Sequence, residues 1–298
     1  MTDRRLRALQ IGISALALAI GIGVLLIPWW WVGRRLHYGI DLEPATYAYP
    51  ADEAAACAAD SRPGRGGRGR SERTPEGVGY FVAAPANYDA RRAHPLIVVF
   101  APHGANRFLT ERFTGLTHVA TEEGFVVAYV DARPIDPGHL AELGRVAADV
   151  ANRWCIDTER VFFTGHSDGG TAATALAVLG LASPPPAAIA PSAAGFRRED
   201  LDRYACPRGL PVMLLHNRND ELFPGFGRAA VEWWARCNAC SGETSARVDG
   251  CIAFSGCPAA APTLFCENDG THLDWPERNE AMLRFFEAAP PSRNSTRR

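Results

Sequence analysis

The chain has 298 residues, of which 47% are hydrophobic and 21% charged, so composition favours a folded globular protein over a disordered one. A net charge of −2 gives no reason to expect a nucleic-acid partner. All 31 residues in the combined lysine and arginine count are arginine. This excludes mechanisms that need a lysine, such as Schiff-base chemistry, a Ser–Lys dyad or a P-loop.

The first 35 residues have the pattern of a membrane anchor. Arginines precede an apolar run from Ala8 to Val32, which is long enough to cross a bilayer core of about 30 Å as a helix. Tryptophans stand at its outer end instead of a small-residue cleavage site, so residues 1–35 are expected to form an uncleaved signal anchor. Eight cysteines place the bulk of the chain outside the cytoplasm, in the periplasm or at the cell surface. Cleavage of the segment would give a secreted protein instead.

Residues 36–77 are predicted to be a juxtamembrane segment and a linker. Glycine, proline and arginine dominate from Ser61 to about Gly77, and almost nothing there can be buried. The arginines could bind anionic lipid or nucleic acid, but a solvated flexible linker or surface loop is the favoured interpretation. At the other end, residues 289–298 are predicted to be a disordered tail.

Residues 78–288 alternate between short apolar runs and helical patterns. The expected strands are residues 95–101, 125–130, 161–164, 187–190, 211–215 and 262–265. The expected helices are residues 140–154, 170–181, 228–236 and 277–288. Continuous apolar runs alternating with helices predict an α/β fold, with a mostly parallel sheet covered by helices on both faces. The short segments between the later strands leave little room for a large lid domain.

The candidate nucleophile is Ser167. It lies in the sequence Gly165-His166-Ser167-Asp168-Gly169, directly after a predicted strand and directly before a predicted helix. A Gly-x-Ser-x-Gly motif needs this context, because it holds the serine on a tight strand-to-helix turn. The start of the helix also directs free backbone N–H groups toward developing negative charge.

A nucleophilic serine requires a base and an acid that orients the base. With this motif the chain order is serine, acid, histidine, and His272 is the only histidine beyond residue 216. Asp220 follows the strand at 211–215 and is the favoured acid. Glu221 is its main competitor. Asp269 and Asp274 are poorer candidates for the acid.

Two backbone N–H groups are expected to bind the oxyanion. One is that of Asp168, next to the nucleophile. The other is that of Ala105, in the loop Pro102-His103-Gly104-Ala105-Asn106 after the first predicted strand. His103 is interpreted as a structural histidine and not a catalytic one.

These features resemble the polyhydroxybutyrate-depolymerase and feruloyl-esterase-like branch of the α/β-hydrolases. The resemblance covers about residues 78–288 and is carried by Cys155–Val161, Thr164–Gly170, Pro95–Val99 with His103-Gly104, Asp220, and Gly270-Thr271-His272 with Trp275-Pro276. It implies the α/β-hydrolase fold and a serine esterase that acts on polyesters or on acyl groups of polysaccharides. The chain departs from the family at Asp168, at Asn217 and in the spacing of His272 from Trp275.

The cysteines predict disulfides but not their full pairing. Cys155 and Cys206 each precede a strand and are expected to pair. The remaining cysteines, other than Cys57, cluster before the histidine loop, where bridges would restrict the segment that carries His272: Cys237, Cys240, Cys251, Cys257 and Cys266. The spacing of Cys237 and Cys240 suits zinc or a redox pair, but the chain offers no matching ligand pair, so neither a metal nor a cofactor is expected.

The sequence therefore predicts a membrane-anchored, extracytoplasmic carboxylic-ester hydrolase with Ser167, His272 and Asp220 as its triad. Its expected partner is an ester substrate, either small or polymeric. Two alternatives stay open: a serine peptidase or acyltransferase with the same triad, and a catalytically inactive surface-binding module of the same fold.

Overall fold

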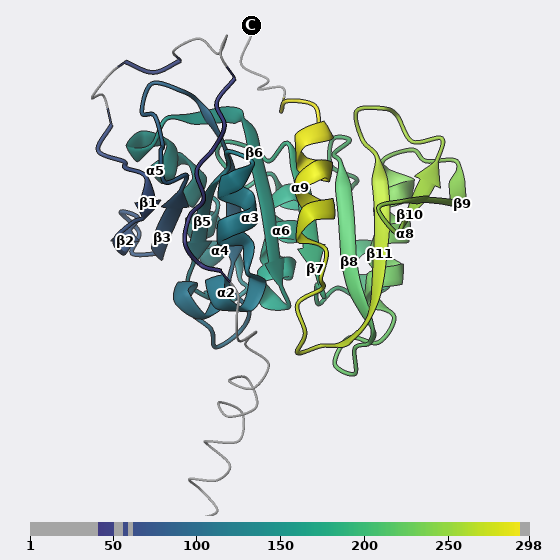
Figure 1. The fold of residues 1–298 in the computed structure, drawn as a ribbon. Coiled ribbons are helices and arrows are strands. Elements are labelled where there is room, and N and C mark those ends of the chain that lie inside the picture. Colours follow the sequence, from purple (N-terminus) through teal and green to yellow (C-terminus); the bar gives the residue numbers. More distant parts are fainter. Residues whose placement is uncertain (1–40, 51–55, 59–61, 293–298) are drawn as a thin grey trace, which may run out of the picture. The chain divides into compact units, whose positions relative to one another are not determined.

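The computed structural model describes residues 41–50, 56–58 and 62–292, which form one compact unit (Figure 1). The predicted anchor at 1–35 lies outside the described residues. Among the residues that are described, no helix has the length and apolar character to cross a membrane.

An eleven-stranded sheet runs through the described unit in the order β1-β3-β5-β4-β6-β7-β8-β11-β10-β9, with β2 paired to β3. The strands are β1 Gly67–Arg68, β2 Glu72–Arg73, β3 Gly79–Ala84, β4 His94–Phe100, β5 Val126–Val130, β6 Ile156–His166, β7 Ala188–Ser192, β8 Val212–Asn219, β9 Gly242–Val248, β10 Cys251–Ser255 and β11 Thr263–Thr271. The six strands from β5 to β11 are parallel, and antiparallel strands flank them on both sides. The mostly parallel sheet and all six predicted strands are thus confirmed.

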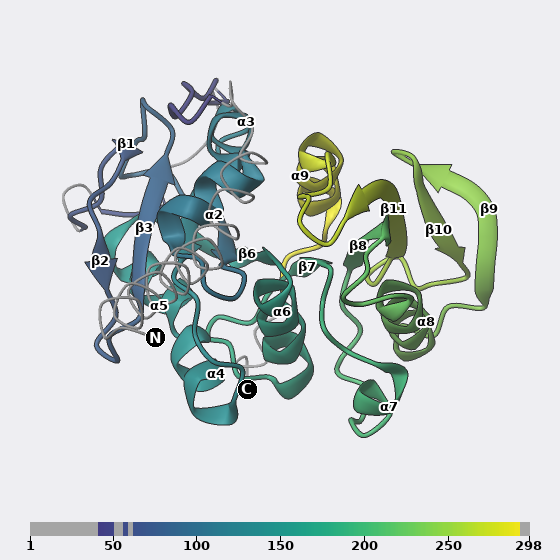
Figure 2. The same ribbon diagram turned by 90° about the horizontal axis from the view of Figure 1, so that it is seen from below.

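Helices cover both faces of the sheet (Figure 2). They are α2 Arg107–Thr114, α3 Leu116–Glu122, α4 Pro137–Leu143, α5 Val146–Arg153, α6 Asp168–Leu179, α7 Arg198–Leu201, α8 Phe226–Cys237 and α9 Asn279–Ala288. Leu96 and Val98 of β4 pack in one apolar cluster with α4, α5, α6 and α8. Ile97 and Val99 pack in a second cluster with α3 and α9. The alternation follows from the pleat, which directs successive side chains to opposite faces.

Several elements differ from the sequence predictions. The single helix expected over 140–154 is two helices, because the chain turns between α4 and α5 at Gly144, where a Cβ would lie 2.2 Å from the Leu181 carbonyl oxygen. Helices α2, α3 and α7 and the flanking antiparallel strands β1, β2, β3, β9 and β10 were not predicted. In the described ranges, the longest segment between parallel strands that follow one another along the chain is the one from β8 to β11, which holds only α8 and the β9–β10 hairpin. The segment between β7 and β8 holds only the four-residue α7, and no lid domain is present in these ranges.

The described part of the predicted linker belongs to the folded unit. Its residues form β1 and β2 at the sheet edge. Gly64 lies so close to α5 that a Cβ there would approach the Arg153 carbonyl oxygen to 2.5 Å. Glycine therefore serves close packing here, where the sequence had indicated flexibility. The predicted tail differs in the same way, since the Ser292 N–H donates to the Glu159 carbonyl at 2.7 Å.

Four disulfides link the cysteines, which is typical of a protein that folds in an oxidising compartment. Cys57 pairs with Cys155 and Cys206 with Cys237, so the expected Cys155–Cys206 bridge is wrong. These two cysteines precede β6 and β8, and β7 lies between those strands. Strands β6 and β8 are therefore two strand spacings apart, or about 10 Å. This separation exceeds the Cα–Cα distance that a disulfide can span.

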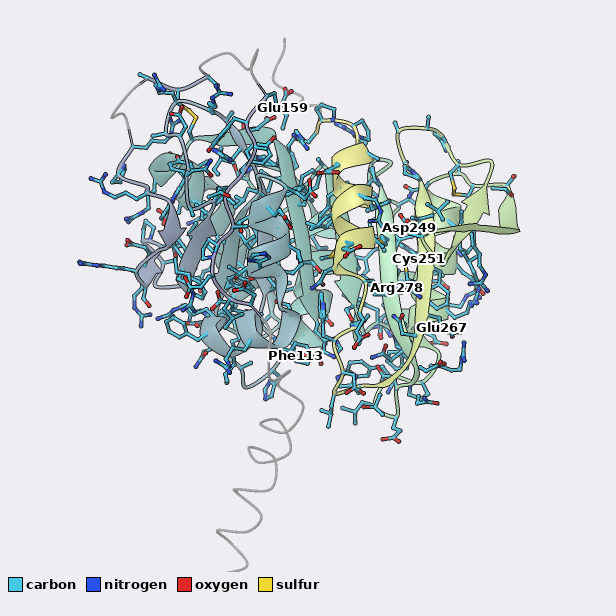
Figure 3. The ribbon with its side chains drawn as sticks, in the orientation of Figure 1. Phe113, Glu159, Asp249, Cys251, Glu267 and Arg278 are labelled. Atoms are coloured by element: carbon cyan, nitrogen blue, oxygen red, sulfur yellow. A yellow bond between two sulfur atoms is a disulfide. The ribbon has the colours of Figure 1, made fainter. Side chains whose placement is uncertain are left out.

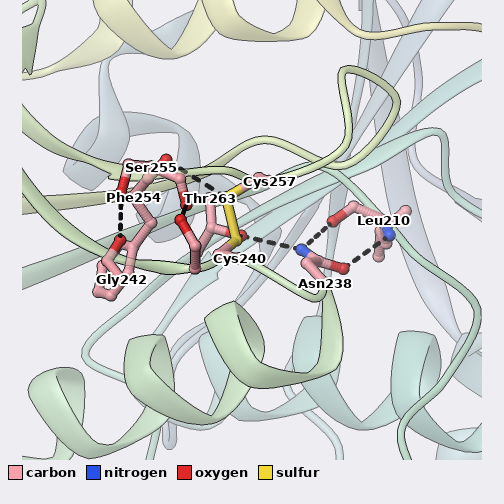
Figure 4. Close-up of a disulfide and its surroundings, with 9 residues drawn as sticks. Leu210, Asn238, Cys240, Gly242, Phe254, Ser255, Cys257 and Thr263 are labelled. Carbon is pink, nitrogen blue, oxygen red and sulfur yellow. Dashed lines mark hydrogen bonds between the residues drawn. A yellow bond between two sulfur atoms is a disulfide. The ribbon is translucent and has the colours of Figure 1, made fainter.

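The other two disulfides hold the β9–β10–β11 region together. Cys240–Cys257 closes the hairpin beside Asn238, which bonds the Leu210 backbone and the Thr263 hydroxyl (Figure 4). Cys251–Cys266 joins β10 to β11, with Cys251 near Asp249 and Arg278 in Figure 3. Because β11 carries the chain toward His272, these bridges restrict the histidine segment as the sequence indicated.

Replacement of Arg68 by alanine is expected to destabilise the protein by about 2 kcal/mol. Arg68 pairs with Glu111, whose side chain is fully buried, and its loss leaves that carboxylate without its counter-charge. Urea unfolding measures the change, with Arg70→Ala at an exposed arginine of the same segment as the control. Equal stability of both variants and the wild type would contradict the placement of this segment in the folded unit.

Candidate active site

Ser167 lies on a sharp turn between β6 and α6, with φ 55° and ψ −118°. The turn is crowded. A Cβ on Gly169 would lie 2.0 Å from the Phe100 carbonyl oxygen, and one on Gly165 would lie 2.6 Å from that same oxygen. Only glycine fits at these two positions, which explains the Gly-x-Ser-x-Gly spacing physically.

The hydroxyl of Ser167 is available for chemistry. Ser167 is the N-cap of α6, yet within the described chain its side chain makes no capping bond to the helix. Its Oγ instead lies 3.0 Å from His272 Nε2. The backbone is fixed separately, because the Ser167 N–H donates to the Ser192 carbonyl at 3.0 Å.

His272 also contacts a buried carboxylate. Its Nδ1 lies 2.8 Å from Asp220 Oδ2, and the Asp220 side chain is fully buried. The second oxygen, Oδ1, accepts hydrogen bonds from the Leu222 and Phe223 backbone N–H groups at 3.0 and 2.8 Å. These bonds hold the carboxylate in the orientation that points Oδ2 at the imidazole. The structure thus brings together the three side chains that the sequence singled out.

The competing acids have other partners or positions. Glu221 is exposed. Asp269 pairs with Arg218 at 2.6 Å at the surface. Asp274 accepts from the Thr271 N–H and hydroxyl at 2.7 and 2.8 Å, which closes the loop around His272. Of these four carboxylates, Asp220 is the one that contacts the His272 imidazole.

Asn217 braces the same loop. Its Nδ2 donates to the carbonyl oxygens of Thr271 and Asp274, both at 2.8 Å. Asn217 is 1% exposed, so both bonds form away from competing water. The residue that departs from the family pattern therefore fixes the segment on either side of His272.

The two predicted oxyanion donors differ in their surroundings. Asp168 is the first residue of α6, and an N–H at that position has no partner within its helix. The Ala105 N–H donates to the Pro102 carbonyl at 3.1 Å and closes a turn. His103 is exposed, and its Nδ1 lies 3.2 Å from the Asp168 carboxylate, so this ring joins the two loops.

Histidines buried around the site were not singled out from the sequence. His166 is 3% exposed and contacts both Ser192 and His272, and burial lowers its pKa to about 4. His216 lies on β8 with Nε2 3.9 Å from Asp220 Oδ2, and burial lowers its pKa as well. The two x positions of the Gly-x-Ser-x-Gly motif carry no steric requirement. The motif therefore did not single out His166, which occupies the first of them.

The fold is shared with known hydrolases. No family model matches the chain. The acetyl xylan esterase of Aspergillus awamori superposes with a TM-score of 0.57 at 14% identity, over 74% of this chain and 99% of that one. Dipeptidyl peptidase 4 of Porphyromonas gingivalis superposes with a TM-score of 0.51 at 13% identity, over 74% of this chain and 34% of that one. The chain has the α/β-hydrolase fold.

The resemblance to feruloyl esterases is also confirmed in sequence. The chain is 23% identical to feruloyl esterase B of Piromyces equi in an alignment 228 residues long that covers 65% of this chain. The chain spans 42% of the length of that relative.

The stability of the folded protein is expected to fall as the pH drops from about 6.5 to about 4. The pKa of His166 is lowered from 6.5 to about 4, so across this window the unfolded chain binds a proton that the folded chain does not. The effect of His166 alone is on the order of 3 kcal/mol. Urea unfolding at pH 7 and pH 5 measures it, and His166→Gln should show the smaller difference. An equal pH dependence in both proteins would contradict the burial of a neutral His166.

Proposed function

We propose that this α/β-hydrolase cleaves carboxylic esters through a covalent acyl-enzyme on Ser167. The observation that carries the proposal is the chain of hydrogen bonds from Ser167 Oγ through His272 to Asp220, at 3.0 and 2.8 Å. A serine, a histidine and a buried carboxylate in this geometry form the proton-transfer arrangement of serine hydrolases.

In the first step Ser167 Oγ attacks the ester carbonyl carbon. His272 Nε2 accepts the hydroxyl proton as the new C–O bond forms. Asp220 accepts the Nδ1–H of His272, which fixes the tautomer and stabilises the imidazolium. Because the two backbone N–H groups hold Asp220, the carboxylate need not reorient during the step.

Negative charge then develops on the carbonyl oxygen. The Asp168 N–H at the start of α6 is placed to bind it, and the helix amino terminus adds a favourable dipole. The second donor is proposed to be the Ala105 N–H, which the oxyanion would share with the Pro102 carbonyl.

Collapse of the tetrahedral intermediate breaks the bond to the alcohol, and His272 returns its proton to the leaving oxygen. The acyl group is now on Ser167. A water molecule gives a proton to His272 and attacks the acyl carbon. Breakdown of this second intermediate frees the carboxylic acid, and the proton returns to Ser167.

The proposed substrates carry bulky acyl groups. Two exposed apolar side chains flank the reacting residues, namely Leu222 beside Asp220 and Leu273 beside His272, with exposed fractions of 64% and 42%. Such side chains suit an apolar or aromatic acyl group. Together with the similarity to feruloyl esterase B, this supports feruloyl or acyl esters of polysaccharides, or a polyhydroxyalkanoate polyester, as the substrate.

Ser167→Ala is expected to lower the hydrolysis of short-chain p-nitrophenyl esters by at least about a thousandfold, because the covalent route is lost. Asp220→Asn should lower kcat by a similar factor, since the wrong tautomer of His272 is then stabilised. Glu221→Gln is the matched control next to Asp220 and should retain activity. The rates are measured on purified, folded variants.

Equal rates for the wild type and Ser167→Ala would refute the proposed function and favour the inactive binding module. Loss of activity in Glu221→Gln but not in Asp220→Asn would reassign the acid. Faster cleavage of peptide p-nitroanilides than of esters would favour the peptidase, and transfer of the acyl group to an added alcohol in preference to water would favour the acyltransferase.

We further propose that residues 1–35 anchor the enzyme in a membrane, with its catalytic unit outside the cytoplasm. The apolar run from Ala8 to Val32 and the four disulfides support this topology. A secreted form would result if the segment were cleaved.

The full chain is expected in the membrane fraction, with its catalytic unit digested by protease added to intact spheroplasts. A chain that begins at Asp41 serves as the control and should be recovered without membranes. Recovery of the full chain in the cytosol with free thiols would contradict the anchor and the orientation.

A further inference from the structure

A closed ring of hydrogen bonds passes through four residues, namely Ser167, Ser192, His166 and His272. The Ser167 N–H donates to the Ser192 carbonyl at 3.0 Å. The Ser192 Oγ lies 3.0 Å from His166 Nδ1, and His166 Nε2 lies 2.6 Å from the His272 carbonyl oxygen. The contact of His272 Nε2 with Ser167 Oγ at 3.0 Å completes the ring.

The chemistry of the partners fixes the proton on His166. A backbone carbonyl only accepts hydrogen bonds, so His166 Nε2 must be the protonated nitrogen. Burial keeps the ring neutral, with its pKa lowered to about 4. Nδ1 is then an acceptor and takes the Ser192 hydroxyl proton. One tautomer satisfies both contacts.

Neighbouring rings hold the His166 imidazole in place. Its centroid lies 5.1 Å from that of Phe113, which is labelled in Figure 3, and 6.2 Å from that of Trp275. The His272 ring lies 5.2 Å away on the same side of the sheet. His166 is 3% exposed, so its bonds form without competition from bulk water.

We propose that His166 is a positioning residue whose Nε2–H bond to the His272 carbonyl sets the separation between Ser167 and the imidazole of His272. The inference rests on the proposed function. His166 is the last residue of β6, and Ser167 follows it directly. The bond therefore ties the backbone of His272 to the strand that leads into Ser167. Asn217 braces the loop from its other side, so the two together leave His272 little freedom.

This role affects the chemical step and not the binding of substrate. His166 is 3% exposed and contacts Ser192 and the backbone of His272, so it presents almost no surface with which to contact an ester. Without the bond the imidazole would sample positions away from Ser167 Oγ, and small misplacements of reacting groups cost up to about a hundredfold in rate.

The experiment compares His166→Phe, which retains the ring volume, with His166→Gln, which retains a side-chain N–H near the position of Nε2. His166→Phe is expected to lower kcat by about 10- to 100-fold with KM within about twofold. The kcat of His166→Gln should be at least about fivefold higher than the kcat of His166→Phe. His94→Phe is the matched control, because the His94 ring is also buried, contacts the Tyr49 hydroxyl and the Gly124 carbonyl, and stands at the start of β4, at the opposite end of the parallel strands from Ser167. Its kcat should stay within about twofold of the wild type.

A folded His166→Phe enzyme with kcat unchanged, a loss confined to KM, or a His166→Gln enzyme as slow as His166→Phe would overturn the proposal. If His166→Phe does not fold, histidine side-chain nitrogen NMR of the wild type decides. A neutral His166 with a slowly exchanging Nε2–H supports the proposal, and a proton on Nδ1 overturns it. The NMR result does not depend on catalytic activity. Retained activity of Ser167→Ala would refute only the proposed function, so the failure of one proposal can be told apart from the failure of the other.

Discussion

The steric crowding of the turn between β6 and α6 is the constraint on which the site depends. The Phe100 carbonyl approaches this turn so closely that neither Gly165 nor Gly169 can carry a side chain. The turn forces Ser167 into a positive-φ conformation and keeps its hydroxyl away from the helix it begins. A reactive serine and a free helix terminus result from one packing arrangement, and both lie at the carboxyl edge of the parallel strands.

The remaining elements of the site bring the side chains of Asp220 and His272 to that turn. Asp220 directly follows β8, and backbone N–H groups fix its carboxylate. His272 directly follows β11. Buried polar side chains link the ends of these strands. Asn217 bonds carbonyl oxygens before and after His272 in the chain, and His166 bonds the carbonyl oxygen of His272 itself. Buried polar networks of this kind rigidify a site, at the expense of tolerance to substitution.

The sequence predicts those parts that local sterics or chain order determine. Ser167 follows from the spacing of glycines, and His272 from being the last histidine in the chain. The choice between Asp220 and Glu221 depends on which carboxylate the loop buries, which adjacent positions in a sequence do not reveal. The disulfides depend on strand order, so β7 between β6 and β8 separates two cysteines that the sequence had paired. The Gly/Arg-rich segment resembles a linker because close backbone packing and flexibility both require glycine.

The disulfide pattern has a consequence for biosynthesis. Cys240–Cys257 and Cys251–Cys266 interleave along the chain, so neither loop encloses the other. Cysteines that oxidise in the order in which they emerge would join Cys240 to Cys251 and Cys257 to Cys266 instead. Reaching the native pairs from that isomer requires thiol–disulfide exchange, which is slow without an enzyme. Production of active protein thus depends on a host that supplies a disulfide isomerase along with an oxidant.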